Sequence, residues 1–345
     1  MSFFINALAS VVIFSAVIFI HELGHFVVAK LSGIKVNEFS IGMGPKLFSR
    51  QKSENDTAYS IRALPIGGFV SMEGEDEESD NENSFTSSPV QSRIAVVVAG
   101  AIMNIVLGFA VLTLIVSMQS AITSKTISQF SDNAMTQKTG LAAKDEIIAV
   151  NGRKCYVADD IIYEFARTQN GVADFTVKRG GKTVELEDVT FETYLDDNGQ
   201  KQLVLDFMVE PIEKTFLSVI KESALWTVSL ARLVFLSFID LVTGHVAVNQ
   251  MSGPVGIVSV ISEAASIGIE PLMMILALIT INLGVFNLLP FPALDGGKLV
   301  FLLIELVRGK AINQKYEIWV NTAGMAILLT FMIFVTFSDI SKFFT

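Results

Sequence analysis

The chain has 345 residues, of which 51% are hydrophobic and 17% are charged, and its mean hydropathy is +0.53. This composition excludes an ordinary soluble globular protein and indicates a membrane protein. The formal charge of −10, with no dominant cluster of Lys and Arg, argues against a nucleic-acid partner, and a single cysteine, Cys155, excludes an internal disulfide framework.

Four stretches are long and apolar enough to cross a hydrocarbon core of about 30 Å, and we expect each to be a transmembrane helix. They cover residues 3–29, 94–118, 271–289 and 318–337. Basic residues gather in the loop between the first two stretches and in the loop between the last two, whereas the C-terminal tail has only Lys342 and the N-terminal tail has none. The positive-inside rule therefore predicts both termini outside the cell and both basic loops in the cytoplasm. No cleavage signal follows the first stretch, so we expect a retained span.

A fifth apolar stretch covers residues 216–242 and differs from the other four in its charges. It carries Lys221, Glu222, Arg232 and Asp240. These charges favour a helix lying in the outer membrane interface over a fifth span. A fifth span would reverse the last two segments and move their basic loop outside.

The region between the second and fifth stretches has a β pattern. Residues 120–211 lack long apolar runs and show short alternating ones, such as DEIIAVNG and DFTVKRGGKTVELEDVTFE, separated by Gly-Gly and Asn-Gly turns. The pattern predicts a β-rich domain outside the cell, inserted between an N-terminal membrane part (residues 1–119) and a C-terminal one (residues 212–345). In the first cytoplasmic loop, residues 58–74 predict two strands that turn at Pro65 to Gly68, a β-hairpin beside the membrane.

The end of the first stretch carries the motif HELGH, residues 21–25. On a helix, positions i and i+4 share a face, so His21 and His25 can hold one zinc ion while Glu22 lies beside it as a general base. A chance match is the alternative, but ionisable residues inside a span are expensive and usually functional. The motif also uses two of the three histidines in the chain.

A catalytic zinc needs a third protein ligand and one open position. The candidates are His245 and Asp240, both predicted outside, and Asp295 in NLLPFPALDGG at the inner end of the third span. Residues 3–20 cover about 27 Å as a helix, which brings His21 to the cytoplasmic third of the bilayer. Asp295 is therefore the predicted third ligand, although a turn aspartate before two glycines is the alternative.

The segment before Asp295 contains Pro290 and Pro292, which forbid a regular helix there. Irregular backbone at membrane depth is tolerated where it lines a protein cavity, so we expect this segment to shape a substrate groove. Asn287 is a candidate donor to a substrate carbonyl or oxyanion, with an interhelical polar contact as the alternative.

These residues together resemble the site-2 protease family of intramembrane zinc metalloproteases, and most closely its bacterial regulator-of-sigma-E protease type with an extracytoplasmic PDZ domain. The likeness covers nearly the whole chain, because HELGH, LPIGGFVSMEGE, VVAGAIMN, a PDZ-like segment, MSGPVGI and NLLPFPALDG follow one another in the family's order. The resemblance implies zinc held by His21, His25 and Asp295, with Glu22 as the base and Asn287 in contact with substrate. It also implies that the hairpin holds substrate as an added strand, which is physically reasonable because a helical substrate must be extended before hydrolysis. The hairpin residues concerned are Gly67, Gly68, Phe69 and Val70.

Two departures from the family pattern stand out. Ala101 takes the place of the usual proline after Ala-Gly in the second span, while Asn104 remains and is interpreted as a packing residue. In the PDZ-like segment, Lys144 stands where a glycine usually precedes the aspartate, which argues against binding of peptide ends.

The resulting hypothesis is an α-helical integral membrane protein of the bacterial cytoplasmic membrane. It has four transmembrane helices, an inserted extracytoplasmic PDZ-like domain and a cytoplasmic membrane-associated β-hairpin, and it is surrounded by membrane lipid. The resemblance implies a Zn2+ metalloendopeptidase that cuts single-span membrane proteins, such as an anti-sigma factor or a remnant signal peptide, after a first (site-1-type) protease has trimmed them outside.

Two alternatives remain open at this point. A non-catalytic PDZ-type membrane adaptor with a vestigial zinc site predicts no bound zinc. A membrane zinc protease that cuts soluble or prenylated proteins typically takes a glutamate as its third ligand.

Overall fold

The computed structural model describes residues 2–53, 56–75, 77, 79–168, 170–195, 201–244 and 253–341. The chain forms two compact units, one made of residues 1–111 and 230–345 and the other of residues 112–229. The boundaries between them fall inside two long helices, α2 (Val90–Met118) and α5 (Phe216–Val242).

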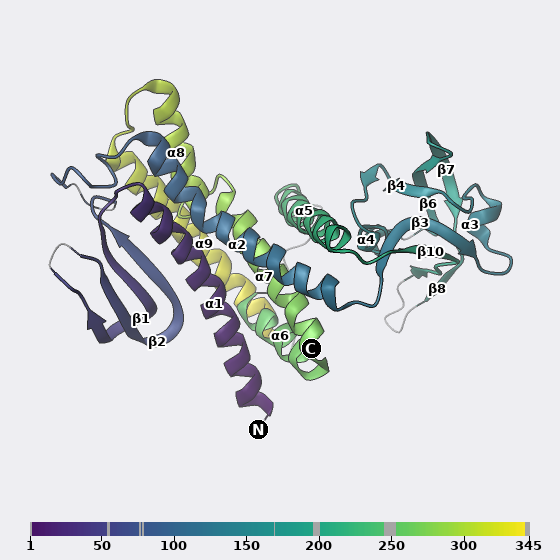
Figure 1. Cartoon of the computed structure of the whole chain (residues 1–345), viewed down its shortest axis with the longest axis horizontal. Helices are drawn as coiled ribbons and strands as arrows, with labels where there is room; N and C mark the ends of the chain where they lie inside the picture. The colour runs from purple at the N-terminus through teal and green to yellow at the C-terminus, as the bar shows by residue number, and fades with distance from the viewer. Residues whose placement is uncertain are drawn as a thin grey trace. The chain divides into compact units, whose positions relative to one another are not determined.

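The first unit is built on long apolar helices, and all four predicted stretches are helical (Figure 1). They are α1 (Ser2–Leu31), α2, α7 (Ile269–Leu288) and α9 (Gln314–Ser341). Helix α7 ends at Leu288 because Pro290 and Pro292 cannot continue it. Two shorter helices, α6 (Pro254–Ile267) and α8 (Asp295–Arg308), were not predicted, because neither is long enough to give a clear membrane pattern.

The predicted count of four spans is not confirmed. Five helices are long and apolar enough to cross a membrane, since α5 meets the same limits as α1, α2, α7 and α9. The rings of Phe238 in α5 and Phe286 in α7 are 6.0 Å apart. Helix α5 thus contacts α7 at this end, and its placement in the outer interface stays a prediction.

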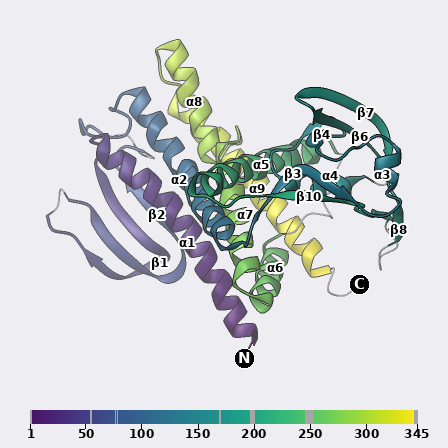
Figure 2. The same cartoon turned by 45° about the vertical axis from the view of Figure 1, so that its right-hand side comes forward.

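A β-sheet lies alongside α1, and Figures 1 and 2 show it on the side of α1 away from α2 and α7. It consists of β1 (Val36–Arg50) and β2 (Ala58–Met72). The first half of β1 lies between the two halves of β2, because Phe39 is paired both with Val70 and with Tyr59. The predicted pairing within residues 58–74 is therefore wrong: the two halves of β2 pair with β1. Gly67, at the expected bend, has a φ of 72°, and a Cβ there would meet Ile18 of α1 at 3.1 Å.

The second unit contains the β-rich part that the sequence predicts. Its sheet has the order β10-β3-β4-β6-β7, with β5 paired to β4, and its strands are antiparallel. Helix α4 and the short α3 accompany the strands, and β8 and β9 form a separate pair (Figure 2). The bounds are β3 (Ile122–Phe130), α3 (Met135–Lys138), β4 (Glu146–Val150), β5 (Arg153–Lys154), α4 (Ala158–Arg167), β6 (Val172–Arg179), β7 (Lys182–Thr190), β8 (Thr193–Leu195), β9 (Lys201–Leu203) and β10 (Phe207–Ile212).

A buried ion pair fixes the turn before β4. The Asp145 carboxylate is fully buried and accepts two hydrogen bonds of 2.7 Å from the Arg179 guanidinium, which raise the pKa of Arg179 above its ordinary value. Lys144, the residue that departs from the family pattern, has a φ of 72°. The turn thus keeps the left-handed geometry that favours glycine, with a lysine in it.

Candidate metal centre

Helix α1 brings the HELGH residues to one place, as the i, i+4 spacing predicts. His21 and His25 are buried, and their Nε2 atoms are 3.1 Å apart. The Nδ1 atom of His25 lies 2.8 Å from the Val96 carbonyl of α2. When Nδ1–H donates to this carbonyl, the tautomer is fixed and Nε2 is left as a free ligand atom.

Asp295 completes the cluster from the opposite side. It is the first residue of α8, and its Oδ2 lies 3.1 Å from His21 Nε2 and 3.3 Å from His25 Nε2. The ligand atoms of the three residues all lie within 4.8 Å of one another. Oδ2 is buried without a hydrogen-bond donor among the described residues. Two imidazole nitrogens and an orphaned carboxylate oxygen that converge in this way fit a zinc ion.

The close approach of α1 and α2 depends on glycine. A Cβ on Gly100 would lie 2.4 Å from His25 Nε2 and 2.7 Å from His21 Cε1. A Cβ on Gly24 would lie 2.5 Å from the Ala99 carbonyl oxygen. Contacts this short do not occur, so the two histidines occupy space that any other residue at position 100 would fill.

Two asparagines flank His21. The amide nitrogens of Asn104 in α2 and Asn287 in α7 are each 3.4 Å from His21 Nδ1, and that of Asn287 is also 3.4 Å from His21 Nε2. Asn104 is fully buried, and its Oδ1 has no partner among the described residues. A 180° rotation of this amide brings Oδ1 toward Nδ1–H of His21, which would again leave Nε2 free.

Glu22 contacts the β-sheet through one hydrogen bond. The Val70 backbone N–H of β2 donates to Glu22 Oε2 at 3.0 Å, which holds the carboxylate next to the histidines. Among the described contacts of the four predicted hairpin residues, the hydrogen bond from Val70 is the one that reaches a motif residue. Phe69 instead packs under the Arg62 guanidinium, 4.7 Å from its ring centroid, and a Cβ on Gly68 would meet the Ser40 carbonyl oxygen at 2.5 Å.

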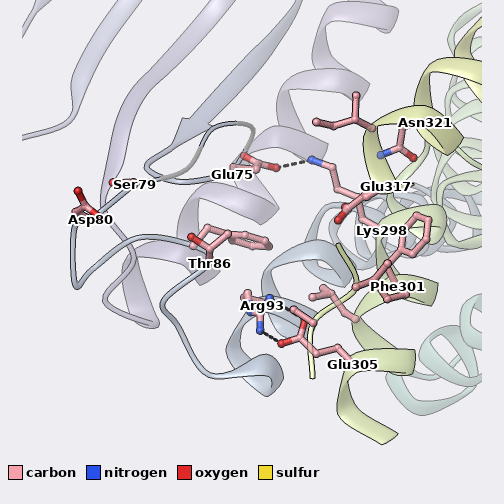
Figure 3. Close-up of a pocket in the computed structure, with 15 residues that line it drawn as sticks. Glu75, Ser79, Asp80, Thr86, Arg93, Lys298, Phe301, Glu305, Glu317 and Asn321 are labelled. Atoms are coloured by element: carbon pink, nitrogen blue, oxygen red, sulfur yellow. Dashed lines mark hydrogen bonds and ion pairs between the residues drawn. The ribbon is translucent and has the colours of Figure 1, made fainter. Parts of the chain in front are cut away.

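Two adjoining pockets approach the cluster on the α8 and α9 side. One, of about 600 Å³, is lined by Asp295, Lys298, Asn321 and apolar residues of α9. The other, of about 450 Å³, shares Lys298 and Asn321 and extends to the start of α2 (Figure 3). Lys298 pairs with Glu75 at 2.8 Å, and the Arg93 guanidinium pairs with both oxygens of Glu305. These ion pairs tie α8 to α2 and to the loop between β2 and α2.

The structure thus brings together His21, Glu22, His25, Asn287 and Asp295. Asp240 is not in the cluster, and His245 and the first two residues of MSGPVGI lie outside the described residues. Sequence reasoning missed Gly100 and gave Asn104 only a packing role, although both touch the histidines. Their position one helical turn apart, on the helix that follows HELGH, was the available signal.

Buried histidines and a carboxylate inside a bundle of apolar helices define a membrane metalloprotease. The chain belongs to peptidase family M50, whose family model matches residues 9–331. It is 38% identical to a protein assigned as a zinc metalloprotease in Clostridium acetobutylicum, over 99% of this chain and 98% of the relative. It is 33% identical to the regulator of sigma-W protease RasP of Bacillus subtilis, over 99% of this chain and 100% of the relative, and 30% identical to the zinc metalloprotease RasP of Bacillus licheniformis.

Proposed function

We propose that His21, His25 and Asp295 hold the catalytic zinc and that Glu22 is the general base of an intramembrane endopeptidase. The observation that carries the proposal is the convergence of these three ligand atoms, with Glu22 beside them, among helices long enough to span a membrane. Zinc, when bound, polarises the scissile carbonyl and lowers the pKa of water toward neutrality.

The other residues near the cluster position the reacting groups. Glu22 accepts the proton of the attacking water and passes it to the leaving amine, and the Val70 N–H keeps its carboxylate oriented. The Asn287 amide donates a hydrogen bond to the substrate carbonyl as charge develops on it. The half of β2 at Gly68–Val70 accepts an unwound substrate as an added strand, which satisfies backbone groups that unwinding exposes.

We propose a four-span topology with both termini outside: the relative directions of α1, α2 and α7 support the number of spans, and the basic loops support the orientation. Ile13 and Val17 of α1 pack with Leu272 and the following residues of α7, while His21 meets Asn287 at the end of α7, so these helices run in the same direction. Helix α2 runs in the opposite direction, because His25 meets Val96 whereas His21, one turn earlier, meets Asn104.

The chain therefore leaves the membrane after α2 on the same side as the start of α7. The number of membrane crossings between the end of α2 and the start of α7 is then even. Helix α6, with 14 residues, covers about 21 Å and is too short to be a second crossing. This favours an α5 that does not cross the membrane.

The substrate class is a membrane protein with a single span, because the cluster sits at membrane depth and a scissile bond must reach it. The Bacillus subtilis relative is named a regulator of sigma-W protease, which supports an anti-sigma factor as one substrate. The PDZ-like region, residues 120–211, acts as a filter that admits substrates already trimmed outside by a first protease. Deleting it should leave cleavage intact and relax the need for trimming; loss of all cleavage would count against the filter.

The function is tested with purified protein in zinc-containing liposomes and a single-span substrate tagged at both ends. Wild type should release two fragments, and Glu22→Gln should keep its zinc but slow cleavage by about a hundredfold or more. Equal cleavage by both proteins would show that Glu22 is not the base. Bound zinc with no cleavage by wild type would favour a substrate outside the single-span class, and absence of zinc would favour the adaptor.

A further inference from the structure

A basic pocket lies at the end of α1, away from the metal cluster. It has a volume of about 510 Å³ and is lined by Lys30, Arg50 and Lys52, together with Thr57 and Tyr59. Among the described residues that line it, Asp56 is the one that is acidic. Across the described part of the chain no carboxylate pairs with any of the three cations. The pocket therefore carries an excess of positive charge that is suited to a phosphate group.

The position of the pocket relates it to the membrane surface. The candidate span in α1 ends at Leu31, so Lys30 lies where the hydrocarbon core gives way to headgroups. A cation at this level is within reach of lipid phosphates. The metal cluster lies nearer the N-terminus of α1, within the candidate span.

The two strands that carry Arg50 and Tyr59 also present apolar side chains. Arg50 is paired with Tyr59, and two residues along each strand Phe48 is paired with Ile61. Because side chains alternate along a strand, these four residues share one face of the sheet. On this face Phe48 is 59% exposed and Ile61 is 49% exposed.

A polar pocket that continues into an exposed apolar face matches a phospholipid, with its phosphate among the cations and its acyl chains along the sheet. We propose that Lys30, Arg50 and Lys52 bind the headgroup of an anionic glycerophospholipid, with Phe48 and Ile61 against its acyl chains. Exposed apolar surface of this kind marks an interaction site, and the net positive charge selects an anionic lipid over a zwitterionic one. Tyr59 is held at the junction by Phe26 of α1, with ring centroids 6.0 Å apart.

The test measures lipid binding to the purified full-length protein in a neutral detergent by native mass spectrometry. Phosphatidylglycerol is compared with phosphatidylcholine of the same chain length. The pocket variant is Lys30→Gln/Arg50→Gln/Lys52→Gln. The control variant, Arg308→Gln/Lys310→Gln/Lys315→Gln, removes the same number of lysines and arginines from the end of α8, the segment after it and the start of α9.

Wild type and the control should prefer phosphatidylglycerol by about tenfold or more, given roughly fivefold per cation near an anionic lipid and the offset from Asp56. The pocket variant should bind the two lipids within about twofold of each other. Arg50→Gln alone should give a partial loss, which keeps the test valid if the triple variant does not fold.

Three results would overturn the proposal. They are an equal loss in the control variant, no lipid preference in wild type, and displacement of phosphatidylglycerol by millimolar inorganic phosphate. The last result would identify a site for free phosphate rather than for lipid. Conversely, Phe48→Ser/Ile61→Ser should weaken binding of long-chain phosphatidylglycerol while leaving its short-chain form unaffected.

Discussion

Gly100→Ala should disable the enzyme through a single added carbon. The new Cβ would lie 2.4 Å from His25 Nε2 and 2.7 Å from His21 Cε1, whereas unstrained carbon contacts lie at about 3.5 Å or more. One imidazole or the helix must therefore move by about 1 Å. A misplacement of about 1 Å can cost about a hundredfold in rate, or about 2.7 kcal/mol of transition-state stabilisation.

Gly108→Ala is the matched control, since it makes the same change two turns further along α2. Its Cβ would also meet an atom at 2.4 Å, but that atom belongs to the side chain of Ile281. We expect this variant to lose some stability and to keep its zinc and most of its activity.

The assay is zinc content per purified protein together with kcat/KM on a single-span substrate in liposomes. Gly100→Ala should fall about a hundredfold below Gly108→Ala in kcat/KM, or lose zinc altogether. Full zinc occupancy and equal activity in the two variants would refute the reasoning, because the histidines would then not be held where a Cβ at position 100 would lie.

Three further predictions follow from individual contacts. Asn104→Ala should weaken zinc binding by about tenfold to a hundredfold in a chelator competition, through loss of the partner that orients His21; unchanged affinity would return Asn104 to a packing role. Lys144→Gly should raise the free energy of unfolding by about 0.5–1 kcal/mol in a denaturant melt, because removing left-handed strain outweighs the exposed Lys144–Glu210 pair; a loss of stability would contradict this. Burial would raise the pKa of Glu38, but hydrogen bonds from Lys46, Ser60 and Arg62 outweigh it and hold that pKa below its ordinary value. The stabilisation from Glu38 is thus present above the ordinary carboxyl pKa of about 4.3 and is lost as the pH falls through the lower folded value. Glu38→Gln should therefore reduce the acid sensitivity of β1 and β2 to limited proteolysis, and the idea fails if the pH dependence is unchanged.

The parts of the site that the sequence could predict are those governed by local spacing and by the cost of burying charge. His21 and His25 follow from the helical period, and Asp295 follows from its place at the end of an apolar run broken by prolines. The same reasoning could not find the contacts of Gly100 and Asn104 with the histidines. Those contacts depend on how closely α1 and α2 pack against each other. The spacing of residues within one helix does not predict that distance.

The fold shows the same division between local and non-local information. Apolar runs gave the long helices, but the order of strands in β1 and β2 was mispredicted because the chain between Pro65 and Gly68 suggested a local hairpin. The sheet instead places the first half of β1 between the halves of β2, a pairing fixed by contacts more distant in sequence.

The depth of the scissile bond tests the central claim most directly. Wild-type protein in liposomes would be given a single-span substrate, and the new termini of both fragments would be identified by mass spectrometry. A cut within the cytoplasmic third of the spanning segment, absent with Glu22→Gln, is what the position of His21, His25 and Asp295 predicts. A cut confined to soluble residues far from the span would contradict a catalytic centre at membrane depth.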